Sequence, residues 1–130
     1  MKARTSILLA LVGLALMSQS VQATESLGRL VVFTSQVCGF CRDFQREIGA
    51  IYPRTDLARQ FPMEIVDKDH PPDSMRQWVK QIHFTPTLIV LDRQGKEQTS
   101  ILGYRGEESF WASMEEMSRR MASKTASSAQ

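Results

Sequence analysis

The sequence lacks any large excess of basic charge, any internal repeat and any apolar run long enough to cross a membrane. Its 16 basic residues outnumber the 14 acidic ones by two, and they form no arginine-rich stripe. We therefore expect no nucleic-acid partner. The apolar run Ile7–Met17 is shorter than the about 20 residues that a transmembrane helix needs. Without repeats or a linker, 130 residues indicate one domain.

The N-terminal segment has the pattern of a cleavable signal peptide. Lys2 and Arg4 precede the apolar run Ile7–Met17, and small residues follow at the positions that a signal peptidase recognises. We predict that residues 1–23 are a signal peptide cleaved after Ala23, so that the exported protein loses its two excess positive charges. The alternative is an uncleaved interfacial anchor, and N-terminal sequencing distinguishes the two.

Both cysteines lie in one short motif, Cys38-Gly39-Phe40-Cys41. The apolar run Leu30–Phe33 just before it has the β-branched and aromatic content of a buried strand. Phe44, Ile48 and Ile51 follow at the spacing of one helical face. The sequence therefore predicts that the cysteine pair lies where a strand gives way to a helix.

That location favours redox chemistry. The first turn of a helix has unpaired backbone N–H groups, which stabilise a thiolate at Cys38. Cys41, three residues later, projects to the same side, close enough to form a small disulfide ring. Such a ring constrains the unfolded chain little, so it is better suited to redox exchange than to stabilisation. A static disulfide, half of a zinc site and buried packing are the alternatives.

The remaining patterns predict an α/β domain. Strands are expected at residues 30–33, 63–66, 88–91 and 96–102. Helices are expected from near Cys41, and at residues 55–60, 75–82 and 107–121. This order predicts a mixed four-stranded sheet with helices on both faces, formed by residues 24–121. Residues 122–130 are small and polar, and we expect them to be a disordered tail.

With these features the chain resembles the thioredoxin-like superfamily over essentially all of residues 30–121. The resemblance rests on the Cys-x-x-Cys motif, on Thr85-Pro86 before an apolar strand, and on glycines at 95 and 103. It implies a thioredoxin-like fold in which Pro86 is cis and faces the cysteines. It also implies a substrate-binding surface formed by Phe40, Thr85, Pro86 and Gly103.

The chain departs from the thioredoxin pattern in three places. The first strand and helix of thioredoxins have no counterpart, since residues 24–29 leave no room for them. Val37 replaces the tryptophan that precedes the first cysteine, and Val32 replaces a buried aspartate. Without that aspartate, water or another carboxylate must accept the proton of Cys41, and Glu64 is a candidate by its position on the neighbouring strand.

The resemblance implies a thiol–disulfide oxidoreductase with Cys38 as nucleophile and Cys41 as resolving cysteine. The chain is similar to SoxS-type periplasmic thioredoxins, and its Gly-Phe and Thr-Pro pairs are similar to those of periplasmic disulfide isomerases. Gly39 and Phe40 bring no charge to the site, which favours a reductant. We expect disulfide-containing client proteins, a membrane electron donor, a periplasmic location and no cofactor.

Two other classes of function remain open at this point. One is a zinc or copper site formed by Cys38 and Cys41 with His83. Adding His70 completes a Cys₂His₂ set. A redox-inactive binding domain that uses a groove beside Pro86 is the other. Metal analysis of the reduced protein and a Cys38→Ser variant test these alternatives.

Overall fold

The computed structural model describes residues 25–130, so the predicted signal peptide lies outside the described part. In chain order, the elements are β1 (Gly28–Thr34), α1 (Gly39–Phe44), η1 (Gln45–Gly49), η2 (Tyr52–Arg54), α2 (Asp56–Gln60), β2 (Met63–Asp67), η3 (Asp73–Met75), α3 (Arg76–Val79), β3 (Thr87–Asp92), β4 (Glu97–Leu102) and α4 (Glu107–Ser128). Of the η segments, η1 is a π-helix and the other two are 3₁₀-helices.

The four strands form one mixed sheet in the order β2-β1-β3-β4. β1 pairs in parallel with β2, and the intervening helices α1 and α2 form the crossover that such a connection requires. β1 and β4 each pair antiparallel with β3, and a hairpin joins β3 to β4. This sheet confirms the predicted fold class.

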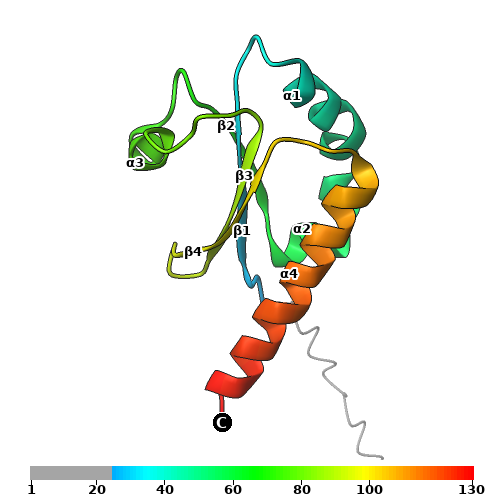
Figure 1. The fold of residues 1–130 in the computed structure, drawn as a ribbon. Coiled ribbons are helices and arrows are strands. Elements are labelled where there is room, and N and C mark those ends of the chain that lie inside the picture. The colour runs from blue at the N-terminus through cyan, green and yellow to red at the C-terminus, as the bar shows by residue number, and fades with distance from the viewer. Residues whose placement is uncertain (1–24) are drawn as a thin grey trace, which may run out of the picture.

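Helices cover both faces of this sheet (Figure 1). α1, α2 and α4 lie on one side, and α3 lies on the other. Leu30 and Val32 of β1 face the larger core with the first group of helices, whereas Val31 and Phe33 face the smaller core under α3. Because both of its faces are covered, β1 is a continuous apolar run rather than an alternating one.

The helix after the cysteines and the helix at 75–82 differ from the predicted ones. α1 ends at Phe44 and continues as the π-helix η1, in which Ile48 is fully buried. The predicted 75–82 helix is a 3₁₀ turn followed by four residues of α-helix. Hydrogen-bonded turns follow this helix, and in one of them the Ile82 N–H donates to Val79 O at 3.0 Å. Ile82 still packs on the smaller core.

The prediction of a disordered tail is wrong for most of its length. α4 begins at Glu107 as expected but continues to Ser128. Side-chain hydroxyls support the added turns, since Thr125 donates to Met121 O at 3.0 Å. Lys124 also reaches Gln98 of β4 at 3.2 Å. Small residues are compatible with a helix when the preceding turns are already packed. Within residues 25–130, no helix is both long and apolar enough to cross a membrane.

Candidate redox site

The two cysteines form a disulfide at the start of α1. A short turn follows β1 and is closed by the Cys38 N–H, which donates to Ser35 O at 3.2 Å. Cys38 is the N-cap of α1 and has extended backbone angles, with φ −92° and ψ 111°. Its Sγ accepts a hydrogen bond from the Cys41 N–H at 3.1 Å. A backbone donor therefore already faces the sulfur on which negative charge develops when the disulfide is reduced.

The two sulfur-bearing residues differ in their access to solvent. Cys38 is 9% exposed, whereas Cys41 is 2% exposed and lies beneath it. Cys38 is therefore the more open of the two cysteines to an incoming disulfide. This asymmetry matches the order of events in thiol–disulfide exchange, in which one thiol attacks and the other resolves.

The segment around Pro86 lies directly against the Cys38 sulfur. The Thr85–Pro86 peptide bond is cis, and Thr85 O lies 3.3 Å from Cys38 Sγ. In the disulfide form this is a van der Waals contact, because the sulfur has no hydrogen to donate. Once the disulfide is reduced, a Cys38 thiol can donate a hydrogen bond to this carbonyl. The fold thus brings Cys38, Cys41, Thr85 and Pro86 together.

Gly103 and the residue after it fix the Pro86 segment relative to α1. The Gly103 N–H donates to Pro86 O at 2.8 Å, and Gly103 has φ +77°. Tyr104 donates to Glu47 of η1 at 2.6 Å. Burial, together with this hydrogen bond, raises the pKa of Tyr104, so it remains a neutral donor. Sequence reasoning missed Tyr104 and Glu47, which carry no motif of their own.

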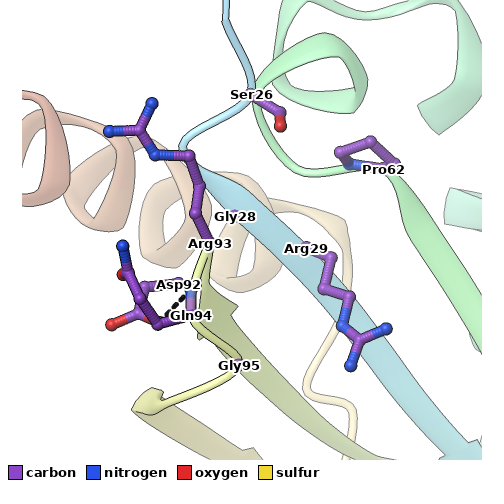
Figure 2. A pocket seen from close by; sticks show the side chains of 8 residues that line it. All are labelled: Ser26, Gly28, Arg29, Pro62, Asp92, Arg93, Gln94 and Gly95. Carbon is purple, nitrogen blue, oxygen red and sulfur yellow. Dashed lines mark hydrogen bonds between the residues drawn. The ribbon is translucent and has the colours of Figure 1, made fainter.

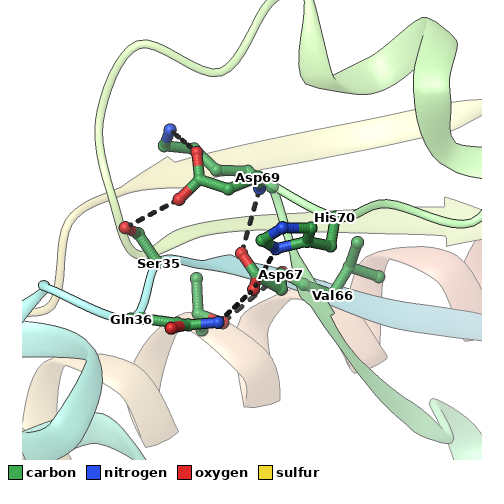
Figure 3. A network of polar contacts seen from close by, with 8 residues as sticks. Ser35, Gln36, Val66, Asp67, Asp69 and His70 are labelled. Carbon is green, nitrogen blue, oxygen red and sulfur yellow. Dashed lines mark hydrogen bonds and ion pairs between the residues drawn. The ribbon is translucent and has the colours of Figure 1, made fainter.

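A polar network holds the turn that precedes Cys38 (Figure 3). Ser35 donates to Asp69 at 3.1 Å, and Gln36 donates to Asp67 at 3.2 Å. Asp67 also accepts from the Asp69 N–H at 2.9 Å and lies 3.2 Å from His70 Nδ1. The loop after β2 therefore positions the loop after β1. Sequence analysis assigned no role to residues 67–69.

The network also sets the charge state of its two carboxylates. The pKa of Asp67 is held below its ordinary value, mainly by the hydrogen bond from the Asp69 N–H and next by the one with His70. The pKa of Asp69 is also lowered, mainly by its hydrogen bond with Lys68 and next by the one with Ser35. Both shifts arise because hydrogen-bond donors favour the charged form of a carboxylate. The two aspartates are therefore ionised acceptors at neutral pH.

Phe40 projects from the rim of the site and is 65% exposed. Two further apolar side chains next to the site are also exposed, namely Val37, at 91%, and Phe84, at 65%. Sequence analysis missed Phe84, although an aromatic residue in a loop beside Thr85 was a usable signal.

The residues proposed for other roles lie apart from the disulfide or have other partners. Val32, at the position of the thioredoxin aspartate, is fully buried. Glu64 is half-exposed and pairs with Arg29 at 3.8 Å, so it has another partner. His70 is bound to Asp67, and no group of three or more metal-ligating side chains occurs within residues 25–130. The zinc set with His70 and His83 is therefore not assembled.

A cavity of about 570 Å³ lies at the opposite end of the sheet (Figure 2). It opens beside Gly28, where β1 begins, and beside the β3–β4 turn. Its two arginines already have partners, because Arg29 pairs with Glu64 and Arg93 with Glu25 at 3.0 Å. No cysteine lines this cavity. The disulfide, not this cavity, is the chemically equipped site.

The comparisons with known proteins agree with this geometry. The family model described as a thioredoxin-like domain matches residues 17–118. No curated protein sequence matches the chain at a significant level. Among solved structures, the periplasmic thioredoxin SoxS of Paracoccus pantotrophus, in its reduced form, is 28% identical, with a TM-score of 0.58. That match covers 72% of this chain and 95% of the other.

Two more distant structures share the fold. The thioredoxin of Fasciola hepatica is 23% identical with a TM-score of 0.54, and the match covers 68% of this chain and 81% of that one. The Schistosoma mansoni thioredoxin pre-protein is 19% identical with a TM-score of 0.55, and the match covers 75% and 82%. At these identities the likeness concerns the fold alone.

Proposed function

This chain belongs to the thioredoxin-like family and is a thiol–disulfide oxidoreductase, and we propose that it reduces disulfides of partner proteins in the periplasm. The observation that carries the proposal is the disulfide itself. Cys38 is the less buried of its two cysteines, at 9% exposed against 2% for Cys41, and the Cys38 sulfur lies 3.3 Å from Thr85 O. A partner disulfide must meet both Cys38 and the Pro86 segment to react.

In the proposed reaction the protein starts as the dithiol. The Cys38 thiolate attacks one sulfur of the partner disulfide, forming a mixed disulfide and releasing the other partner sulfur as a thiolate. The Cys41 thiol then loses its proton to water, and its thiolate attacks Cys38 Sγ. This step forms the Cys38–Cys41 disulfide and releases the second partner thiolate. Two electrons pass to the partner, whose two thiolates take up protons.

The direction of exchange depends on how strongly the Cys38 thiolate is stabilised. One backbone N–H faces its sulfur, and Gly39 and Phe40 between the cysteines are uncharged. Strong stabilisation of the thiolate makes an oxidant, and weak stabilisation leaves a reductant. We therefore expect a potential nearer to that of thioredoxin, at about −270 mV, than to the about −120 mV of a strongly oxidising periplasmic enzyme.

The periplasmic location rests on the predicted signal peptide and on the similarity to a periplasmic thioredoxin. In an oxidising compartment the disulfide form accumulates unless a donor restores the dithiol. A membrane electron donor that supplies two electrons per cycle would complete the reaction. N-terminal sequencing of the exported protein tests the first claim, and an N-terminus at Met1 would refute cleavage.

Trapping of the mixed disulfide tests the proposed function directly. In a Cys41→Ser variant the second step cannot occur, so Cys38 stays bound to its partner. We expect disulfide-linked complexes that dissociate on addition of dithiothreitol. The matched Cys38→Ser variant should form none, because Cys41 is buried. Equal trapping by both variants, or a potential close to that of the strong oxidant, would contradict the proposal.

A further inference from the structure

We propose that Tyr104 is a positioning residue for disulfide exchange, and that its hydrogen bond to Glu47 holds a backbone carbonyl against the Cys38 sulfur. This inference rests on the proposed function and adds a side chain to the same site. Tyr104 acts on Cys38 through the chain segments that lie between them.

Hydrogen bonds and backbone connect Tyr104 to the sulfur of Cys38. Tyr104 follows Gly103, whose N–H donates to Pro86 O at 2.8 Å. The carbonyl before Pro86, Thr85 O, lies 3.3 Å from Cys38 Sγ. A displacement of Tyr104 is therefore passed through the Gly103 hydrogen bond to the Thr85 carbonyl.

Tyr104 contacts the helical segment that starts at Cys38 in two ways. Its ring packs edge-on against Phe44 of α1, with the ring centroids 5.5 Å apart. Its hydroxyl donates to Glu47 Oε2 of η1 at 2.6 Å. Arg46 donates to the other carboxylate oxygen, Oε1, at 3.0 Å, so the carboxylate is held from both sides. These contacts close a ring that begins and ends on one helical segment.

The acceptor of this hydrogen bond lies in the π-helix η1. Single π-helical turns are rare, and they are found frequently at functional sites. Ile48, the next residue, is fully buried and anchors the turn, whereas the Glu47 side chain is 31% exposed. The carboxylate is thus fixed at the rim of the fold, where the hydroxyl of Tyr104 meets it.

The position of the Thr85 carbonyl matters because it opposes the Cys41 N–H at the Cys38 sulfur. The N–H, at 3.1 Å, favours a thiolate. The carbonyl oxygen instead accepts a hydrogen bond from the thiol and repels the thiolate. Holding this carbonyl in place therefore keeps the pKa of the Cys38 thiol higher than the N–H alone would set it. It also keeps the Pro86 segment where a partner disulfide has to meet it.

A Tyr104→Phe variant removes the hydroxyl and keeps the ring on Phe44. We expect the pKa of the Cys38 thiol to fall by about half a unit, because the released carbonyl opposes the thiolate less. The pH dependence of alkylation of the reduced protein by iodoacetamide measures this pKa. The rate at which the dithiol form reduces a synthetic peptide closed by one disulfide should fall about threefold, since the Pro86 segment is misplaced.

Tyr52→Phe is the matched control. Tyr52 is fully buried in the larger core, and its hydroxyl donates to Phe61 O at 2.8 Å. It takes no part in the ring of contacts. Removing this hydroxyl should lower the free energy of unfolding in urea, while the pKa of the Cys38 thiol and the peptide rate stay at wild-type values. A loss of stability alone therefore does not reproduce the effect expected at Tyr104.

Two variants of Glu47 separate the hydrogen bond from the charge. Glu47→Gln keeps an oxygen that accepts from Tyr104 and loses the charge, so it should retain most of the wild-type pKa and rate. Glu47→Ala loses both and should match Tyr104→Phe, and the double variant should change little further. A pKa that falls in Glu47→Gln but not in Tyr104→Phe would show that the charge acts on Cys38 directly, contrary to the proposal.

The positioning role and the proposed function fail in different ways. Wild-type values of the thiol pKa and the peptide rate in Tyr104→Phe would overturn the positioning role and leave the oxidoreductase intact. Equal changes in Tyr104→Phe and Tyr52→Phe would assign the effect to stability and reject that role as well. A wild-type protein that reduces no peptide disulfide would refute the proposed function itself.

Discussion

At the scale of single residues, the site depends on a glycine whose role is conformational. Gly103 has φ +77°, a region that is costly for residues with a side chain, and its N–H holds Pro86 O. Gly95, in the β3–β4 turn, has the similar φ of +79°. A Cβ added at either position would meet no atom within 4 Å. Both glycines therefore need a positive φ, but only Gly103 is bonded to the Pro86 segment beside the disulfide.

This pair yields a matched prediction. Gly103→Ala and Gly95→Ala should each lower the free energy of unfolding by about 1–2 kcal/mol, because alanine is strained at positive φ. Only Gly103→Ala should slow disulfide exchange, by several-fold, because relaxation of the strain moves the N–H away from Pro86. Urea unfolding and peptide reduction measure the two effects. Equal loss of exchange in both variants would show that Gly103 acts only through stability.

At the scale of elements, the disulfide is held by loops from two neighbouring parallel strands. The turn after β1 presents Cys38, and the loop after β2 supplies Asp67 and Asp69 as acceptors for that turn. Parallel strands end at the same edge of a sheet, so these loops meet although Ser35 and Asp69 are 34 residues apart. Ionised carboxylates thus stabilise the position of the nucleophile.

The network predicts how stability depends on pH. The folded-state pKa of Asp67 lies below its ordinary value of 3.8, so its stabilisation is complete above that pH and is lost as the pH falls through the folded pKa. We expect the melting temperature to fall between pH 5 and pH 2. Asp67→Asn should reduce that fall, since the titrating group is gone.

Asp73→Asn is the control for this measurement. Asp73 pairs at 2.9 Å with Arg76, three residues later, and links no separate loops. This variant should keep the wild-type fall in melting temperature. If Asp67→Asn keeps the same fall as well, the network does not contribute the expected acid sensitivity.

At the scale of the whole molecule, the sheet is covered on both faces and buries no carboxylate. Thr34 and Thr87 are the buried polar residues within 25–130, and Val32 is fully enclosed in the larger core. The fold therefore offers no buried acid to accept the Cys41 proton. The sequence left water or another carboxylate open as the acceptor, and within residues 25–130 no buried carboxylate is present to take that role.

Placing an acid at this buried position should make stability depend on pH. In Val32→Asp, burial raises the pKa of the new carboxyl, so the folded state binds its proton more tightly than the unfolded state does. The free energy of unfolding should therefore decrease as pH rises above about 4, reaching a loss of about 3–5 kcal/mol at pH 7. Urea unfolding at pH 4 and pH 7 measures this difference.

Val32→Asn is the matched control, because it places a polar group of the same size but does not titrate. It should be destabilised to a similar extent at both pH values. If the free energy of unfolding of Val32→Asp depends on pH no more than that of Val32→Asn, water reaches this part of the core.

The helix boundaries show where sequence reasoning reached its limit. The apolar stripe at 75–82 correctly identified side chains that pack under the sheet, but the segment is mostly turns. Composition alone indicated disorder after Met121, yet α4 continues to Ser128 beside Gln98. Both errors arose because neighbouring elements decide where a helix ends, and those neighbours are distant in the sequence.

The sequence by itself determined the order of strands and helices and the location of the cysteine pair, because periodicity and short motifs depend on adjacent residues. Only the tertiary structure decided what surrounds the disulfide. Thr85 reaches Cys38 from the loop before β3, Asp69 reaches Ser35 from the loop after β2, and Tyr104 reaches Glu47 from beyond the last strand. Strand register and helix packing create these contacts, and no local pattern encodes them.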